Sequence, residues 1–143
     1  MPTRTKVLFL CYGNACRSQM AEAIARHLAA DIIEASSAGL VPFGDIPATT
    51  ITVLAERGFS AEGQISKPLR PEDISAADLV INMTGRSGKS IFAPPQPALE
   101  DWDVGDPYGL DLAIYREIRD QIEARVNDLA KRLRDKVNIR QSA

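Results

Sequence analysis

The sequence predicts an α/β fold: a single domain with an open, mostly parallel four-stranded sheet flanked by helices. Short apolar runs alternate along the chain with amphipathic segments, which is the order expected when strands alternate with helices. The 143 residues suit one domain, spanning residues 1–143, with one good core. A hydrophobic fraction of 45% and a charged fraction of 25% are ordinary for a globular protein.

The first half of the chain predicts two strands and two helices. Residues 7–10 are a short buried strand, and residues 18–28 form a helix with apolar side chains at a spacing of four. A second strand covers residues 32–37. Pro47 suits the first turn of the next helix, which runs to about Arg57 before Gly58.

The second half is predicted in the same way. Pro71 opens a short helical turn over residues 72–77, and a strand follows at 78–83. A polar loop covers 84–90, and a short fourth strand covers 99–104. The spacing of apolar residues predicts a long helix from 112 to about 136, followed by a polar, frayed tail at 138–143. Three prolines exclude a long helix before the fourth strand: Pro94, Pro95 and Pro97.

The most informative segment is residues 11–18, Cys-Tyr-Gly-Asn-Ala-Cys-Arg-Ser, which lies between the first strand and the first helix. A loop that opens a helix directs free backbone N–H groups at a bound anion, and the helix dipole favours the negative charge. Arg17 adds a planar fork suited to a tetrahedral oxyanion. Such surroundings stabilise a thiolate at Cys11. This phosphate-binding loop after the first strand therefore predicts a nucleophile aimed at the centre of an oxyanion.

The other loop residues are predicted to bind the substrate. Asn14 tolerates left-handed backbone angles and can brace the loop with its amide. Ser18 can cap the helix. Cys16 fits either a packing role or a redox pairing with Cys11. The full set of predicted binding residues in the loop is Tyr12, Gly13, Asn14, Ala15, Cys16 and Ser18.

Several carboxylates lie in the segment shortly before the last helix, and Asp106 is one candidate for an acid. Asp106 precedes Pro107 in a turn, and a carboxylic acid held near the thiolate can protonate the leaving oxygen of a phosphate ester. Tyr108 suits an aromatic wall for a substrate ring, with Tyr12 and Phe43 as further apolar walls. Two competing carboxylates lack a following proline: Asp101 and Asp103.

Several functional classes are excluded by composition. The net charge of −2 gives no reason to expect a nucleic-acid partner. No apolar run approaches the roughly 20 residues that span a bilayer, and no signal-peptide pattern is present, so a cytoplasmic protein without a membrane partner is expected. With one histidine and two cysteines in the chain, neither a protein-built metal site nor a cofactor is expected. Residues 83–90 end in Gly-Lys-Ser like a nucleotide loop, but Met83 replaces the required first glycine.

These motifs resemble the low-molecular-weight protein tyrosine phosphatase family, whose superfamily includes the thioredoxin-type arsenate reductases. The matching pieces run nearly end to end: residues 11–18, Ser37-Ala-Gly39, Ala77-Asp-Leu-Val-Ile81, Asp106-Pro-Tyr-Gly109 and the C-terminal helix. The resemblance implies that Asp106 is the general acid and that the Ser18 hydroxyl bonds to the Cys11 thiolate. It also implies that Ser37 supports the loop through Asn14, and that Cys16 can pair with Cys11 on oxidation.

The expected function is hydrolysis of a phosphate monoester, most readily protein phosphotyrosine or another aryl phosphate, through a phosphocysteine. The alternative is arsenate reduction with an external small thiol or a redoxin, because the related reductases carry two further cysteines in the region of residues 84–90 and this chain has none there. A non-catalytic anion-binding domain is the third possibility. The expected partner is accordingly a phosphorylated protein, a small aryl phosphate, or phosphate or arsenate itself.

Overall fold

A four-stranded parallel sheet organises the computed structural model, which describes residues 4–92 and 98–142. Its strands are β1 (Thr5–Cys11), β2 (Ile33–Gly39), β3 (Leu79–Asn82) and β4 (Ala98–Asp101), in the spatial order β2-β1-β3-β4. All three pairings are parallel, which confirms the predicted sheet. Because β1 is central, its carboxyl end lies between two neighbouring strands, where ligands bind in open α/β sheets.

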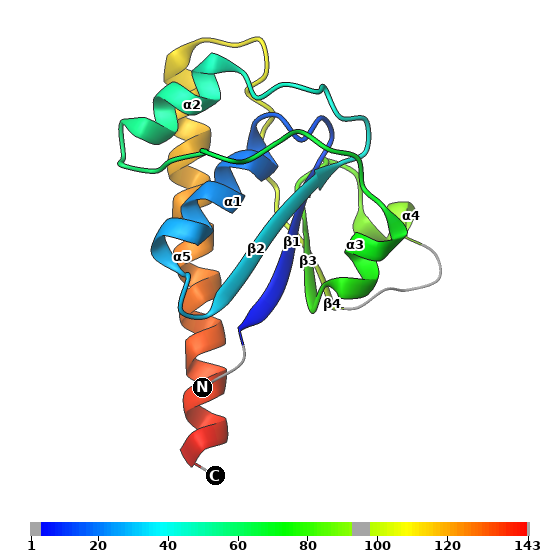
Figure 1. Cartoon of the computed structure of the whole chain (residues 1–143), viewed down its shortest axis with the longest axis vertical. Coiled ribbons are helices and arrows are strands. Elements are labelled where there is room, and N and C mark those ends of the chain that lie inside the picture. The colour runs from blue at the N-terminus through cyan, green and yellow to red at the C-terminus, as the bar shows by residue number, and fades with distance from the viewer. Residues whose placement is uncertain (1–3, 93–97, 143) are drawn as a thin grey trace.

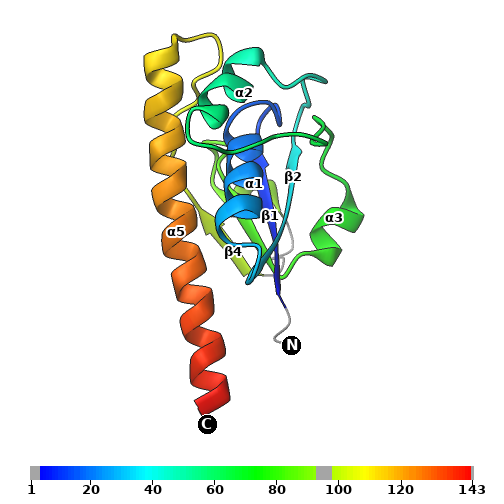
Figure 2. The same ribbon diagram turned by 60° about the vertical axis from the view of Figure 1, so that its left-hand side comes forward.

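Helices cover both faces of the sheet (Figure 1). The helices are α1 (Arg17–Leu28), α2 (Ala48–Ala55), α3 (Pro71–Ala76), α4 (Gly88–Ile91) and α5 (Leu112–Ser142). Figure 2 shows α1 packed between the sheet and the long α5, with α3 on the opposite side. The parallel strands are therefore buried on both faces, as expected for strands joined by helical crossovers.

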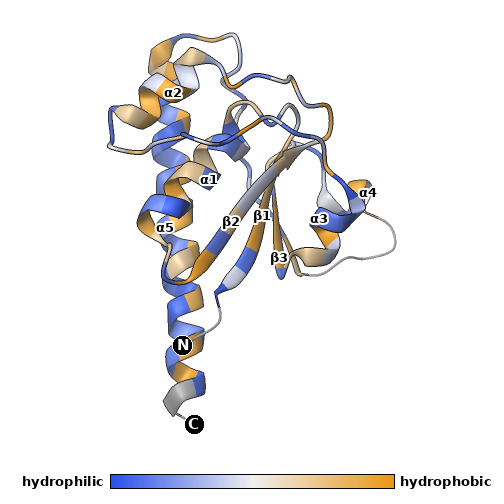
Figure 3. Ribbon diagram, in the orientation of Figure 1, coloured by the Kyte–Doolittle hydropathy of each residue, from blue (hydrophilic) through white to orange (hydrophobic). Residues whose placement is uncertain are grey.

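The core divides into two layers at β1, because successive side chains of a strand point to opposite faces. Val7 and Phe9 join the larger layer with α1, α2 and α5, while Leu8 and Leu10 join a smaller layer that includes Val80. Figure 3 shows the resulting apolar colour along the strands. Full burial of each such large side chain contributes about 1.5–3 kcal/mol. This double burial explains why residues 7–10 of β1 are a continuous apolar run.

The segment between β3 and α5 differs from the sequence-based expectation in one helix and one strand. The polar segment 84–90 contains the start of α4, whose Gly88 N–H donates to an Asp101 carboxylate oxygen (3.1 Å). An acidic group therefore occupies the N-terminus of that turn. β4 begins one residue and ends three residues before the predicted 99–104, and the three prolines at 94, 95 and 97 lie outside the described residues.

The C-terminal helix is longer than its apolar spacing predicts. α5 continues to Ser142, so residues 138–142 are helical in the structure, beyond the end at about residue 136 that the spacing predicts. The end of α5 extends beyond the sheet in both views (Figures 1 and 2). Despite this length, no helix in the described part of the chain is apolar enough to cross a membrane.

The carboxylate of Glu56, just after α2, joins two arginines of α5. Its oxygens accept hydrogen bonds from Arg116 Nη2 and Arg119 Nη1, each at 2.8 Å. The hydrogen bond from Arg116 is the main cause that lowers the pKa of Glu56 below its usual 4.5. The ionised carboxylate therefore favours the folded state.

Glu56→Gln is expected to lower the melting temperature at neutral pH by a few degrees, because the pair with Arg116 is partly exposed and contributes little, whereas the buried Arg119 loses a charged acceptor. The folded-state pKa is lowered, so this contribution is present above pH 4.5 and is lost as the pH falls through the folded value. Melting curves of both proteins between about pH 7 and about pH 3 should converge at the acidic end. A gap that stays constant across this range would show that the charge is not responsible.

Candidate active site

The site is built where β1 passes into α1. Cys11 is the last residue of β1 and Arg17 the first of α1, so the loop between them sits at the carboxyl edge of the sheet. Asn14 adopts a left-handed conformation with φ of +48°. Gly39 at the end of β2 packs directly on this loop, since a Cβ there would lie 2.7 Å from the Asn14 nitrogen. The glycine of the Ser-Ala-Gly motif thus makes room for the loop.

A directed set of hydrogen bonds connects the loop to the Cys11 thiol. The Lys67 backbone N–H donates to Asn14 Oδ1 (2.9 Å), which fixes the orientation of that amide. Asn14 Nδ2 then donates to Ser18 Oγ (2.7 Å), and Ser18 Oγ lies 2.9 Å from Cys11 Sγ. When Cys11 is a thiolate, the Ser18 hydroxyl is the donor of that last pair and stabilises the negative charge.

Arg17 lies beneath the loop with an incomplete set of partners. Its side chain is only 6% exposed, its Nη1 donates weakly to the Val104 carbonyl (3.4 Å), and its Nη2 lies 3.6 Å from Asp106 Oδ2. Within the described residues the buried Nε–H has no hydrogen-bond partner. A buried unsatisfied donor is costly, and a tetrahedral oxyanion in the loop would satisfy it.

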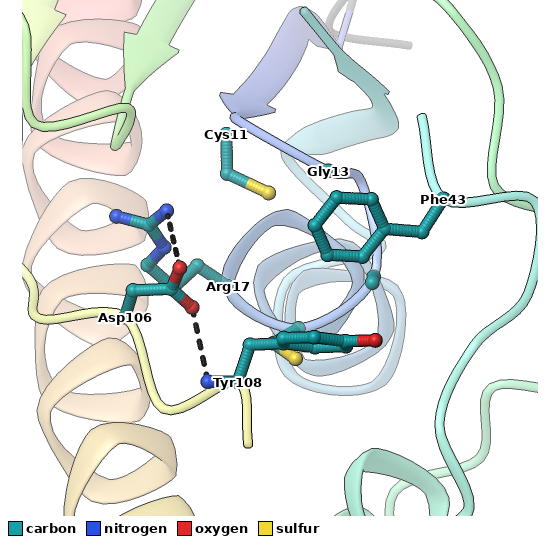
Figure 4. A pocket seen from close by; sticks show the side chains of 8 residues that line it. Cys11, Gly13, Arg17, Phe43, Asp106 and Tyr108 are labelled. Carbon is teal, nitrogen blue, oxygen red and sulfur yellow. Dashed lines mark hydrogen bonds and ion pairs between the residues drawn. The ribbon is translucent and has the colours of Figure 1, made fainter. Parts of the chain in front are cut away.

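Asp106 faces the same cavity as the thiol. Figure 4 shows its carboxylate beside Arg17, on the side of the cavity opposite Phe43. Asp106 Oδ1 accepts a hydrogen bond from the Tyr108 N–H (3.1 Å), which sets the turn, while the side chain remains 49% exposed. A carboxyl group held this way can exchange protons with solvent and with a ligand in the loop.

Aromatic rings form one wall of the cavity. Phe43 and Tyr108 both line it, with ring centroids 4.7 Å apart in an edge-to-face arrangement. Gly13 leaves room for Phe43, because a Cβ at Gly13 would lie 2.7 Å from that ring. Tyr12 is not among the residues that line the cavity. Its ring packs edge-on against Phe43 instead, with the two ring centroids 6.2 Å apart. The structure therefore brings Tyr108 to the cavity as predicted, whereas Tyr12 supports the wall from outside.

Cys16 lines the cavity but has its own environment. Both cysteines are free thiols, and Cys16 Sγ lies 3.6 Å from the Tyr115 hydroxyl. Burial raises the pKa of Cys16 above its usual 9.0, an effect that outweighs the hydrogen bonds of Tyr115 and Thr50. Cys16 is thus held as a neutral thiol. The neighbouring Ala15 also lines the cavity, and its carbonyl accepts a hydrogen bond from Thr50 Oγ1 (3.2 Å).

The predicted support of Asn14 by Ser37 is not what the structure shows. The Ser37 hydroxyl donates to Glu22 Oε1 (2.5 Å). Gln19, which the sequence analysis did not single out, donates from Nε2 to Asn14 Oδ1 (2.9 Å) and shares this acceptor with the Lys67 N–H. A polar residue in the first turn of a helix that is otherwise buried could have indicated Gln19. The sequence does not identify its other partners, however, because they lie some 45 residues away.

The structure places a thiol at the head of a helix-opening loop on a parallel α/β sheet, with a guanidinium and a carboxylate lining the same cavity. The sequence model of the family described as low molecular weight phosphotyrosine protein phosphatase matches residues 6–139. The chain belongs to this family, whose fold its solved relatives share.

Relatives in the family include both reductases and phosphatases. The chain is 36% identical to the glutaredoxin arsenate reductase of Synechocystis, over 90% of this chain and 98% of the relative. It is 32% identical to the protein-arginine-phosphatase of Bacillus subtilis, over 90% and 96% of the two chains. Among solved structures, an arsenate reductase in the phosphate binding state superposes with a TM-score of 0.80 at 35% identity, covering 90% and 98%. A mutant of YwlE from Bacillus subtilis superposes with a TM-score of 0.82 at 29% identity, covering 91% of this chain and 99% of that chain.

Proposed function

We propose that the protein hydrolyses phosphate monoesters, with protein phosphotyrosine and other aryl phosphates as the substrate class, through a phosphocysteine on Cys11. The observation that carries the proposal is the Asp106 carboxylate, which lines one cavity with the Cys11 thiol and Arg17. Binding alone needs neither a nucleophile nor an acid. The rings of Phe43 and Tyr108 beside the cavity supply apolar surface for an aryl group.

The reaction proceeds in two displacements. In the first, the Cys11 thiolate attacks phosphorus, the P–S bond forms, the P–O ester bond breaks, and Asp106 gives its proton to the leaving oxygen. The loop N–H groups and Arg17 hold the equatorial oxygens as charge develops. In the second, Asp106 takes a proton from water, whose oxygen attacks phosphorus. The P–S bond then breaks, and the Ser18 hydroxyl stabilises the departing thiolate.

The number and the surroundings of the cysteines support phosphate transfer over arsenate reduction. Arsenate reduction consumes two electrons, which thiols supply by forming a disulfide. The chain has two cysteines, and Cys16 is buried against Tyr115. A reductase activity would therefore draw on an external small thiol or a redoxin. The identity to arsenate reductases keeps this as the second candidate, tested by arsenate-dependent oxidation of glutathione with and without glutaredoxin. Either reaction requires reduced Cys11, which suits the cytoplasmic location expected from the sequence.

Asp106→Asn tests the acid directly. The variant is expected to slow hydrolysis by about 100- to 10,000-fold for alkyl-substituted phenyl phosphates, whose leaving oxygens need the proton. Nitrophenyl phosphate has a stable leaving group and should lose much less. The measurement is kcat/KM for a series of aryl phosphates, which reports the first displacement alone, plotted against the acidity of the leaving phenol.

Asp103→Asn serves as the matched control, because Asp103 is a nearby carboxylate that does not line the cavity. It should keep the slope of the wild-type plot. An equal and small loss for every leaving group in Asp106→Asn would reduce Asp106 to a turn residue and remove the main support for the phosphatase proposal.

A further inference from the structure

Gln19 is a neutral polar side chain with no exposed surface in the first turn of α1, directly after the loop. A buried primary amide must find several partners, since it carries two donors and an acceptor with two lone pairs. Gln19 does not touch the cavity. Its partners show what it holds in place.

The Gln19 amide joins the loop to a distant segment. Its Nε2 donates to Asn14 Oδ1 (2.9 Å), to the Asn14 carbonyl (3.1 Å) and to the Ile65 carbonyl (2.9 Å). Its Oε1 accepts a hydrogen bond from Gln64 Nε2 (2.7 Å), which also donates to the Gln19 carbonyl (3.1 Å). Backbone carbonyls can only accept, so they fix the orientation of both amides.

This orientation continues toward the thiol. Asn14 Oδ1 accepts from two donors, Gln19 Nε2 and the Lys67 N–H, so Asn14 Nδ2 faces Ser18. Ser18 Oγ accepts that hydrogen bond and can give its own proton to Cys11 Sγ. The side-chain route from Gln64 through Gln19, Asn14 and Ser18 thus donates in one direction, toward the sulfur of Cys11. The bond from Gln19 to the Ile65 carbonyl runs the other way and anchors the amide.

We propose that Gln19 is a positioning residue that orients Asn14 and, through Ser18, the donor that stabilises the Cys11 thiolate. Gln64 holds Gln19 in the required orientation. The inference rests on the proposed function in treating Cys11 as the nucleophile. Without Gln19, Asn14 Oδ1 keeps one of its two donors, and a left-handed Asn14 is held less firmly.

The test is Gln19→Met in the full chain, which preserves side-chain length and removes every hydrogen bond of the amide. The readout is the pH profile of Cys11 alkylation by iodoacetamide, followed on the Cys11 peptide by mass spectrometry. The midpoint should move upward by about one pH unit, since one lost hydrogen bond of about 1 kcal/mol corresponds to a shift of that order. Alkylation in the acidic range should fall about tenfold, with an unchanged rate at high pH.

Ser18→Ala makes the test specific. If Gln19 acts through Ser18, Gln19→Met should move the midpoint by less than about 0.3 units in the Ser18→Ala background, because the double-mutant cycle removes the shared route. A full shift in that background would overturn the proposal, as would an unchanged midpoint in the single variant. Gln121→Met, on the exposed face of α5, is the matched control and should leave the midpoint unchanged.

Gln64→Met provides a second route if Gln19→Met does not fold, because Gln64 is only partly buried. It removes the donor that orients Gln19 and should shift the midpoint in the same direction by a smaller amount. No shift in a folded Gln64→Met would contradict the proposed chain of orientation. Alkylation needs no phosphate ester, so failure of this inference is distinguishable from failure of the proposed function.

Discussion

Replacing Cys11 by serine is expected to lower kcat for an aryl phosphate by at least about 10,000-fold, the order seen when a covalent nucleophile is removed. The serine hydroxyl is a far weaker nucleophile than a thiolate, and the site offers no base positioned to activate it: the described neighbour of Cys11 Sγ is the Ser18 hydroxyl. The measurement is steady-state turnover of nitrophenyl phosphate by reduced protein, with and without a chelator.

The same variant should still bind inorganic phosphate, because the loop N–H groups and Arg17 are retained. Binding is measured by calorimetry on wild type and Cys11→Ser. Retained phosphate binding without turnover would separate the nucleophile from the anion site. Activity that survives the substitution, or that the chelator removes, would rule out a phosphocysteine route.

Arg17→Lys should lower kcat/KM by about 100- to 1,000-fold, the typical cost of removing a donor aimed at transition-state charge. Lysine keeps the positive charge but loses the planar fork that can bond two oxygens at once. It also loses the Nε–H that stands buried and unsatisfied in the structure. The measurement is kcat/KM together with the inhibition constant of inorganic phosphate.

Arg134→Lys is the matched control for this substitution. Arg134 lies on α5 and forms an exposed ion pair with Asp31, which lies between α1 and β2. Because Arg134 is not among the residues that line the cavity, its replacement should leave kcat/KM unchanged. Kinetics of Arg17→Lys close to those of the control would show that the fork of Arg17 does not engage the oxyanion.

The parts of the site that the sequence predicts are local in the chain. Cys11, Arg17 and the intervening loop follow from a buried strand, a loop and a helix in immediate succession, and the parallel sheet then places them at its carboxyl edge. The sequence indicates Asp106 through Pro107, which follows it in the Asp-Pro-Tyr-Gly motif, and through its place before α5. The structure brings its carboxylate within 3.6 Å of Arg17.

The residues behind the loop were not predictable in the same way. Gln19 bonds to Ile65 and Gln64, which lie some 45 residues further along in a segment without regular structure. The Ser-Ala-Gly motif predicts that Ser37 supports Asn14. In the structure the Ser37 hydroxyl donates a hydrogen bond to the buried carboxylate of Glu22 on the neighbouring helix α1. Such partners depend on how loops cross above the sheet, and apolar spacing carries no information about them.

The end of α5 shows a different limit. Its apolar spacing predicts the helix only while one face is buried, and that burial ends near Leu133. Beyond it Val137 is partly buried against the core and residues 138–140 are exposed, while the helix continues to Ser142. Arg140 lies in the last turn of α5, where a cation interacts favourably with the helix dipole, which supports the extra turns.

The central claim, a phosphocysteine at the head of the loop, is tested most directly by trapping it. Reduced wild-type protein is mixed with nitrophenyl phosphate, quenched with acid during turnover and digested, and the peptides are mapped by mass spectrometry. The account predicts one phosphoryl group on the sulfur of Cys11, and its loss in Cys11→Ser. Turnover with no covalent phosphoryl enzyme, or with the phosphoryl group on a different residue, would contradict it.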